Sequence, residues 1–368
     1  MTSSTGRKMI LTIIVFILIL GLLIIAHEFG HFIVAKLSGI KVEEFAFGFP
    51  PTIWKKKKGD TVYKINALPL GGYVKMLGED ESVEKPRSYS IQPPLKKVAV
   101  VVAGVVMNMI LAWFLLAIGF SVGMAPILSS AQSVGGTVIK TSVIVADVKA
   151  DSPAAKIGLR AEDQINYIAD QTGQKVSIGQ GTDLTAFTTN HKGQRITVGF
   201  TRGGQEMTAT TVLSSDQTQP LGVAAVDNSI VRVPVYRAPW VALVETGKIF
   251  KLTFDFIGGL LRNIFVKGQV SQDVGGPVAI YMYTGIAVKL GVMAVLQFVA
   301  ILSVNLALIN ILPLPALDGG KILFIILRRI MGRYFIKEHI ENYIHLVGFI
   351  LLIALLVLIT FKDISKFF

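Results

Sequence analysis

The chain has 368 residues, of which 52% are hydrophobic and 16% are charged, and its mean hydropathy is +0.60. These values indicate a polytopic membrane protein with some soluble mass. The net charge of +12 does not indicate nucleic-acid binding, because the basic residues cluster beside apolar runs, where positive-inside topology places them. The absence of cysteine excludes disulfides, thiolate metal sites and cysteine nucleophiles.

The first apolar run lies within residues 1–38 and extends from Met9 to Leu37. As a helix it rises ~43 Å, enough to cross a bilayer. A secretory signal is the alternative, but the run is too long, and cleavage would separate it from the motif at its end. We therefore predict a retained transmembrane helix.

That motif is H-E-x-x-H, written HEFGH at residues 27–31. Positions i and i+4 share one face of a helix, so His27 and His31 can bind the same ion. Glu28 then lies close to the ion, where a metalloprotease places its general base. A chance match is the alternative, but two histidines and a carboxylate inside a membrane-length helix favour function.

Residues 39–97 form a polar segment rich in lysine, including the run Lys55–Lys58, whereas the N-terminus offers only Arg7 and Lys8. The positive-inside rule therefore predicts this segment in the cytoplasm and the N-terminus outside. Within it, residues 62–77 alternate β-forming residues around a Pro/Gly turn at 68–72. This pattern predicts a membrane-associated β-hairpin.

A second transmembrane helix is predicted over residues 98–122, with Asn108 as its single amide at mid-depth. We interpret Asn108 as a helix–helix hydrogen-bonding residue in preference to a site residue. Residues 123–226 lose the long apolar runs and have the size of one soluble domain. We predict strands near 143–145 and 163–168, a capped short helix at 152–159, a helix at 182–190 and a hairpin over 195–213.

Residues 227–291 are amphipathic, and charges every few positions from Trp240 to Val266 favour interfacial helices over a further span. A third transmembrane segment covers 292–331. Its helix is broken at 312–320 by two prolines and two glycines, which membrane depth tolerates only against protein or a polar cavity. The fourth helix, 342–361, carries His345 with Glu341 at i−4. This is a rival metal pair, which we interpret as a polar interfacial pair.

Four blocks together resemble a known family. They are HEFGH, the match of 310–319 to N-x-x-P-x-P-x-L-D-G, the G-G-Y-V-K-M block at 71–76, and the strand–SPAAKIGL–strand stretch of the soluble domain. The chain resembles the site-2 proteases, which are intramembrane zinc metalloproteases, and within them the bacterial regulator-of-sigma-E-protease branch. Two family patterns depart here: residues 48–51 read GFPP where members have G-F-G-P, and Val105 replaces the proline of A-G-P-x-x-N.

The resemblance implies a polytopic α-helical membrane protein with four transmembrane helices, an inserted β-hairpin and one soluble α+β PDZ domain. It implies Zn²⁺ as cofactor and Asp318 as the third ligand, which leaves a fourth tetrahedral position for water. Asn310 corresponds to the residue that hydrogen-bonds the substrate backbone. We expect an edge strand of the hairpin to bind substrate by β-addition, through Gly71, Gly72, Tyr73 and Val74.

The expected function is hydrolysis of peptide bonds within transmembrane segments of single-pass membrane proteins, such as anti-sigma factors or remnant signal peptides. Further expected partners are the lipid bilayer and a peptide or protein ligand of the PDZ domain. The expected location is the inner (cytoplasmic) membrane, with both termini and the PDZ domain outside and the active site toward the cytoplasm.

Two other function classes fit parts of the sequence less well. A non-catalytic PDZ-bearing membrane scaffold with a structural metal site would not need a base, so Glu28 argues against it. A transporter with a broken helix should show two-fold internal repetition, and the sequence shows none.

Overall fold

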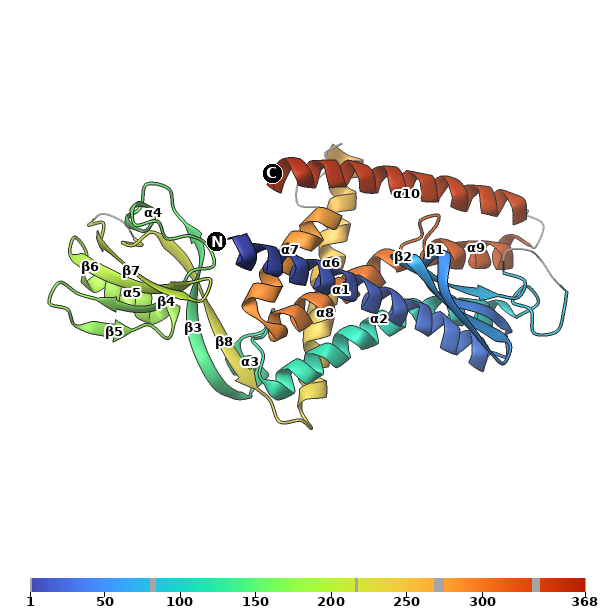
Figure 1. The fold of residues 1–368 in the computed structure, drawn as a ribbon, viewed down its shortest axis with the longest axis horizontal. Coiled ribbons are helices and arrows are strands. Elements are labelled where there is room, and N and C mark those ends of the chain that lie inside the picture. Colours follow the sequence, from blue (N-terminus) through green and yellow to red (C-terminus); the bar gives the residue numbers. More distant parts are fainter. Residues whose placement is uncertain (1, 80–83, 216–217, 268–274, 333–337, 368) are drawn as a thin grey trace. The chain divides into compact units, whose positions relative to one another are not determined.

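The computed structural model describes residues 2–79, 84–215, 218–267, 275–332 and 338–367 (Figure 1). The chain divides into two compact units. One comprises Met1–Gly119 together with Pro239–Phe368, which we call the membrane unit. The other comprises Phe120–Ala238, which we call the sheet unit.

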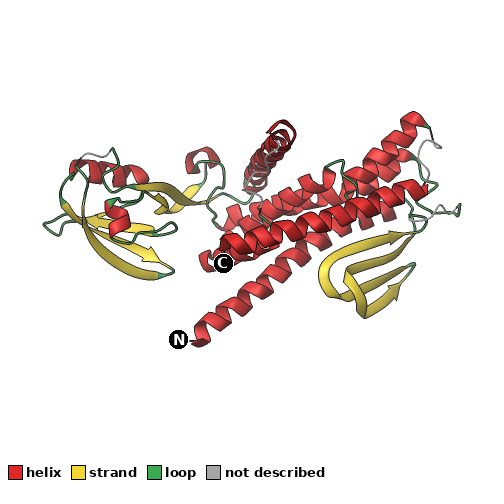
Figure 2. Cartoon of the chain, turned by 90° about the horizontal axis from the view of Figure 1, so that it is seen from above, coloured by secondary structure: helices red, strands yellow, loops and turns green. Residues whose placement is uncertain are grey.

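Four helices of the described residues are long and apolar enough to cross a membrane: α1 (Thr2–Leu37), α2 (Pro94–Val122), α8 (Val292–Ile311) and α10 (Glu338–Phe367). The four predicted spanning helices are therefore confirmed as helices. The other helices of the membrane unit are α6 (Ala238–Lys267), α7 (Pro277–Leu290) and α9 (Asp318–Met331). Figure 2 shows these helices in red, beside a small bent sheet in yellow.

That sheet consists of β1 (Val42–Lys58) and β2 (Thr61–Met76). The predicted hairpin within 62–77 is wrong in its pairing. The hairpin turn lies at Gly59-Asp60, and residues 44–47 of β1 have partners in two parts of β2, 62–65 and 72–75. Both strands bend, so the two arms expected to pair with each other lie on opposite sides of β1. The Pro/Gly stretch at 68–72 makes a bend in one long strand and not a reversal of the chain.

Close helix packing places α1 against α2. A Cβ on Gly30 would lie 2.2 Å from the Ala103 carbonyl oxygen, so the helices touch through backbone at this point. Small residues allow such an approach in membranes, where dispersion contacts replace the hydrophobic effect. Further along α1, Ile19 and Leu23 form an apolar cluster with Leu115 of α2 and Val299 of α8.

The far end of α10 is bound to the start of α7. The buried carboxylate of Asp363 accepts hydrogen bonds from the backbone N–H groups of Gly276 and Ala279, both at 2.9 Å. These N–H groups belong to the first turn of α7 and have no acceptor within the helix. Asp363 therefore caps α7 from a distant part of the chain.

The sheet unit contains a six-stranded sheet in the order β7-β6-β4-β3-β8, with β5 paired to β4. Its strands are β3 (Thr137–Val148), β4 (Gln164–Ala169), β5 (Lys175–Ser177), β6 (Arg195–Arg202), β7 (Gln205–Val212) and β8 (Val223–Arg232), and its helices are α3 (Ala131–Val134), α4 (Pro153–Lys156) and α5 (Gly181–Asn190). The strands predicted near 143–145 and 163–168 correspond to β3 and β4, the helix at 182–190 to α5, and the hairpin over 195–213 to β6 and β7. The capped helix predicted at 152–159 is shorter, the four residues of α4, and α3, β5 and β8 were not predicted. Ser152 caps α4 by accepting from the N–H of Ala155 at 3.2 Å.

Candidate metal centre

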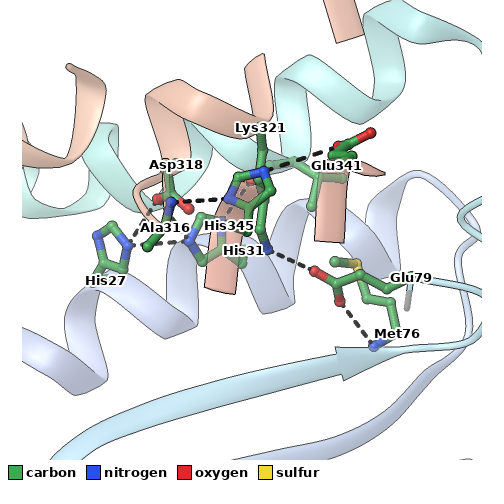
Figure 3. A network of polar contacts seen from close by, with 10 residues as sticks. His27, His31, Met76, Glu79, Ala316, Asp318, Lys321, Glu341 and His345 are labelled. Atoms are coloured by element: carbon green, nitrogen blue, oxygen red, sulfur yellow. Dashed lines mark hydrogen bonds and ion pairs between the residues drawn. The ribbon is translucent and has the colours of Figure 1, made fainter. Parts of the chain in front are cut away.

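The two histidines of HEFGH lie one turn apart on α1 and face the first residue of α9. Their Nε2 atoms are 3.2 Å apart, and Asp318 Oδ2 lies 3.0 Å from His27 Nε2 and 3.2 Å from His31 Nε2 (Figure 3). Helices α1 and α9, which are far apart in the sequence, thus bring three potential ligand atoms together. Among the residues the structure describes, this is the group of three or more His, Cys, Asp or Glu side chains that could hold a metal ion.

The distances fit zinc. Tetrahedral zinc with bonds of about 2.0–2.1 Å places its ligand atoms about 3.3–3.4 Å apart, close to the three separations observed. The Val100 carbonyl can only accept a hydrogen bond, so the 2.8 Å contact with His31 Nδ1 places the proton on that nitrogen. The Nε2 lone pair of neutral His31 then faces the other two atoms. Asp318 Oδ2 is buried and has no hydrogen-bond partner among the described residues, as expected of an atom whose partner is a cation.

Two amides lie beside His27. Asn108 of α2 is fully buried, its Nδ2 is 3.4 Å from His27 Nδ1, and its Oδ1 has no hydrogen-bond partner. Rotating the amide by 180° exchanges its two ends, so that Oδ1 accepts the proton of His27 Nδ1 and leaves Nε2 free as a ligand. Asn310 of α8 lies on the other side, with Nδ2 3.4 Å from His27 Nε2.

The Asn108 side chain does reach another helix, as predicted, but its partner is His27 of α1; separately, its backbone carbonyl accepts from Ser303 Oγ of α8 at 2.8 Å. Its contact with a histidine of the candidate metal centre was not predicted. The available signal was an amide at mid-depth in an apolar span, but that signal alone does not distinguish helix contact from a site role.

Gly104 of α2 is a second residue that sequence reasoning missed. A Cβ at this position would lie 2.5 Å from His31 Nε2 and 2.8 Å from His27 Cε1. The α2 backbone at Gly104 thus packs directly against both imidazoles, and we call this contact the Gly104 wall. Only glycine leaves enough space for so close an approach. Any side chain here would push the imidazoles out of the positions that converge on Asp318.

Glu28 and the bent sheet line one cavity of about 510 Å³ together with the three residues of the candidate metal centre. Residues 72–74 of β2 belong to its lining. Gly72 lies against α1: a Cβ there would be 3.0 Å from Glu28 Cγ and 2.9 Å from Ile24 Cγ2. Gly71 is not part of the lining. It lies at the bend, with φ +125°, against the ring of Phe49.

Asp318 reaches this cavity because the chain reverses sharply between α8 and α9. Its two following glycines permit the fold: a Cβ on Gly319 would be 2.2 Å from the carbonyl oxygens of Ile311 and Leu312, and one on Gly320 would be 2.4 Å from that of Leu314. The carboxylate stands in the first turn of α9, where a helix favours negative charge.

Charged groups surround the cavity on the sheet side. Glu44 accepts from Lys64 Nζ at 2.6 Å and from the Tyr73 hydroxyl at 3.0 Å. The hydrogen bond from Lys64 lowers the pKa of Glu44, and the same bond raises the pKa of Lys64. Lys321 of α9 pairs with Glu79 at 2.9 Å, and the other oxygen of Glu79 accepts from the Met76 N–H at 3.4 Å (Figure 3). This chain of contacts joins the end of β2 to the helix that carries Asp318.

Comparison with known proteins identifies the family of this chain. The family described as peptidase family M50 matches residues 15–355, so the chain belongs to that family, the site-2 proteases. Relatives include CPE1693 of Clostridium perfringens, 34% identical over 96% of this chain and 98% of that one. Regulator of sigma-E protease RseP of Escherichia coli is 29% identical over 95% of this chain and 98% of that one. Zinc metalloprotease RasP of Shouchella clausii is 27% identical over 97% of this chain and 99% of that one.

Among solved structures, the PDZ domain of the SdrC-like protein Lmo2051 from Listeria monocytogenes is 24% identical, covers 24% of this chain and 93% of that chain, and has a TM-score of 0.21. The family membership defines the protein: it is a multi-pass protein of the inner membrane and a zinc metalloendopeptidase that acts within the membrane, with Zn²⁺ as its metal. A non-catalytic scaffold is therefore not its function.

Proposed function

We propose that this enzyme cleaves single-pass membrane proteins within their transmembrane segments, anti-sigma factors and remnant signal peptides being the candidate substrates. In this proposal His27, His31 and Asp318 hold the zinc, and Glu28 is the general base. The observation that carries it is the convergence of three electron-pair donors within 3.2 Å of one another, in a cavity that Glu28 also lines.

Zinc in this position supplies Lewis acidity toward the scissile carbonyl and lowers the pKa of a bound water to about 7. Glu28 accepts the proton of the attacking water and delivers it to the leaving amine. Asn108 and the Val100 carbonyl hold the Nδ1 protons of the two imidazoles, so both Nε2 atoms remain ligands. The Gly104 wall keeps both rings in place.

The bent sheet offers a binding edge for the substrate. Residues 72–75 pair with β1 on one side, and no strand of the described residues pairs with their other side. A substrate helix must unwind before cleavage, which exposes backbone groups at a high cost in low dielectric. We propose that Gly72, Tyr73 and Val74 take up those groups as an added strand and that Asn310 binds others. Gly71 sets the bend before this edge.

The orientation of the chain follows from charge in this proposal. The lysine run Lys55–Lys58 and the pair Arg328 and Arg329 lie on the cytoplasmic side, which places both termini and the sheet unit outside. The helices α6 and α7 lie along the membrane interface, and the sheet unit binds a peptide or protein ligand. Since the natural chain has no cysteine, a single cysteine at Gly59 should be protected from impermeant thiol reagents in intact cells and one at Gly203 should be labelled. Labelling at Gly59 alone would invert the orientation.

The test of the chemistry is Glu28→Gln, which keeps the shape of the side chain but cannot accept a proton. We expect the purified variant to keep its zinc and to lose at least ~10²-fold in turnover of a single-pass substrate. The matched control is Glu162→Gln, an exposed glutamate of the sheet unit, which should cleave at the wild-type rate. Near-normal cleavage by zinc-loaded Glu28→Gln would remove Glu28 from the role of base.

A further inference from the structure

The loop that carries Asp318 contains a residue in an unfavourable conformation. Ala316, two positions before Asp318, has φ +72°, a region that is sterically unfavourable for a residue with a Cβ. Such a conformation persists only where surrounding contacts hold it. The principal contact comes from another element: the Ala316 N–H donates to Nδ1 of His345 on α10 at 2.9 Å (Figure 3).

This hydrogen bond defines the state of His345. Because Nδ1 accepts, the ring is neutral and its proton is on Nε2. That nitrogen faces Glu341 Oε1 at 4.0 Å, and a neighbouring carboxylate favours a proton on Nε2. Glu341 is itself paired with Arg328 of α9. The ring of His345 also lies 5.3 Å from that of Phe324 on α9, so the ring is fixed from both sides.

A second contact lies one turn further along α10. A Cβ on Gly348 would be 2.4 Å from Pro315 Cβ and 2.9 Å from the Pro315 carbonyl oxygen. Helix α10 therefore fits against the loop at two successive positions, once through a hydrogen bond and once through a glycine. Its neighbouring side chains Leu346, Val347 and Phe349 are exposed, so contact is concentrated on this one face.

We propose that His345 is a positioning residue: by accepting the N–H of Ala316 it holds the loop in the conformation that presents Asp318 to the metal. In this role α10 supports the third ligand, and the Glu341–His345 pair is not a rival metal site. Among the described residues, no third ligand joins that pair. The inference rests on the proposed function of Asp318 as a zinc ligand.

Two substitutions separate a hydrogen-bonding role from a structural one. The amide of Asn ends near the position of Nδ1, while that of Gln reaches the position of Nε2. We expect His345→Gln and His345→Leu to bind zinc ~10–100-fold more weakly, the usual cost of losing a group that orients a ligand, and His345→Asn to recover most of the affinity. Zinc affinity is measured on the purified full chain by competition with a chelator. The control Leu346→Ala should bind zinc as the wild type does.

A double variant tests the same role if His345→Leu folds poorly. Glycine adopts φ +72° without strain, so adding Ala316→Gly to His345→Leu should restore part of the zinc affinity. Wild-type zinc affinity in both His345→Leu and His345→Gln would overturn the inference. Asp318→Asn separates the proposed ligand set from the role of His345. If Asp318→Asn keeps all its zinc, the proposed ligand set is wrong. If Asp318→Asn loses zinc but His345→Leu keeps it, only the role of His345 is wrong.

Discussion

The two regions that supply the proposed metal ligands are built differently. His27 and His31 come from one continuous helix, where a spacing of four residues alone places them side by side. Asp318 comes from a turn between α8 and α9 whose shape depends on two glycines, two prolines and a helix that follows in the sequence. Two of the three proposed ligands are therefore positioned by local helix geometry, whereas the third depends on long-range contacts. Zinc affinity on the histidine side should therefore be lost only by changes in the two histidines or in the Gly104 wall. On the aspartate side it should also be lost by changes in residues that do not touch the metal.

The largest effects should come from the ligands themselves. Wild-type protein should carry about one zinc per chain, and both His27→Ala and Asp318→Asn should lose most of it, because each removes one of three protein ligands. Metal analysis of the purified variants measures this. His191→Asn, a histidine of the sheet unit, is the control and should keep its zinc. If Asp318→Asn kept full zinc, the two regions would not form one centre.

A smaller effect should follow from filling the wall behind the histidines. In Gly104→Ala the new methyl group would lie within 2.5 Å of His31 Nε2, so the ring must move and zinc affinity should fall by at least ~10-fold. The matched change is Gly247→Ala in α6, where no atom lies within 4 Å of the new Cβ. That variant should be neutral or slightly more stable, because alanine favours helix. Equal zinc affinity in both variants would show that the imidazoles do not depend on the wall.

The smallest effect should come from the ion pair that joins Lys321 to Glu79 on the aspartate side. The side chain of Lys321 is 46% exposed, and exposed pairs are worth ~0–1 kcal/mol, or less than about 5-fold in zinc affinity. Lys321→Met should therefore weaken zinc binding only slightly, and less at high salt. Lys251→Met, which removes an exposed pair with Asp255, is the control. A loss above 10-fold that salt does not reduce would make this pair as important as the His345 contact.

The same division explains what the sequence could predict. Hydropathy and length were sufficient for the four spanning helices, and the H-E-x-x-H spacing was sufficient to pair the histidines on one face. Asp318 was expected only through family resemblance, because no local rule brings the start of α9 to α1. Gly104 was not predicted, since an apolar helix gives no sign of which small residue faces which neighbour.

The sheet shows a similar limit. Residues around 62–65 and 73–76 were correctly predicted to be extended, because their β-forming residues alternate. Their pairing was not, because β1 enters between the two arms and its strand signal is weakened by two prolines and a run of lysines. In the sheet unit, β8 was missed because Asp227, Asn228 and Ser229 have low strand propensity, while pairing along β3 compensates for it.

The cap that Asp363 places on α7 has a practical consequence for protein production. Two backbone N–H groups in an apolar environment depend on a carboxylate near the last turns of α10. A truncated form that ends before residue 363 would leave both groups without an acceptor, although the metal ligands would all be present. Shortened forms and C-terminal affinity tags should therefore begin their changes beyond Asp363, so that a loss of yield is not mistaken for a loss of catalytic residues.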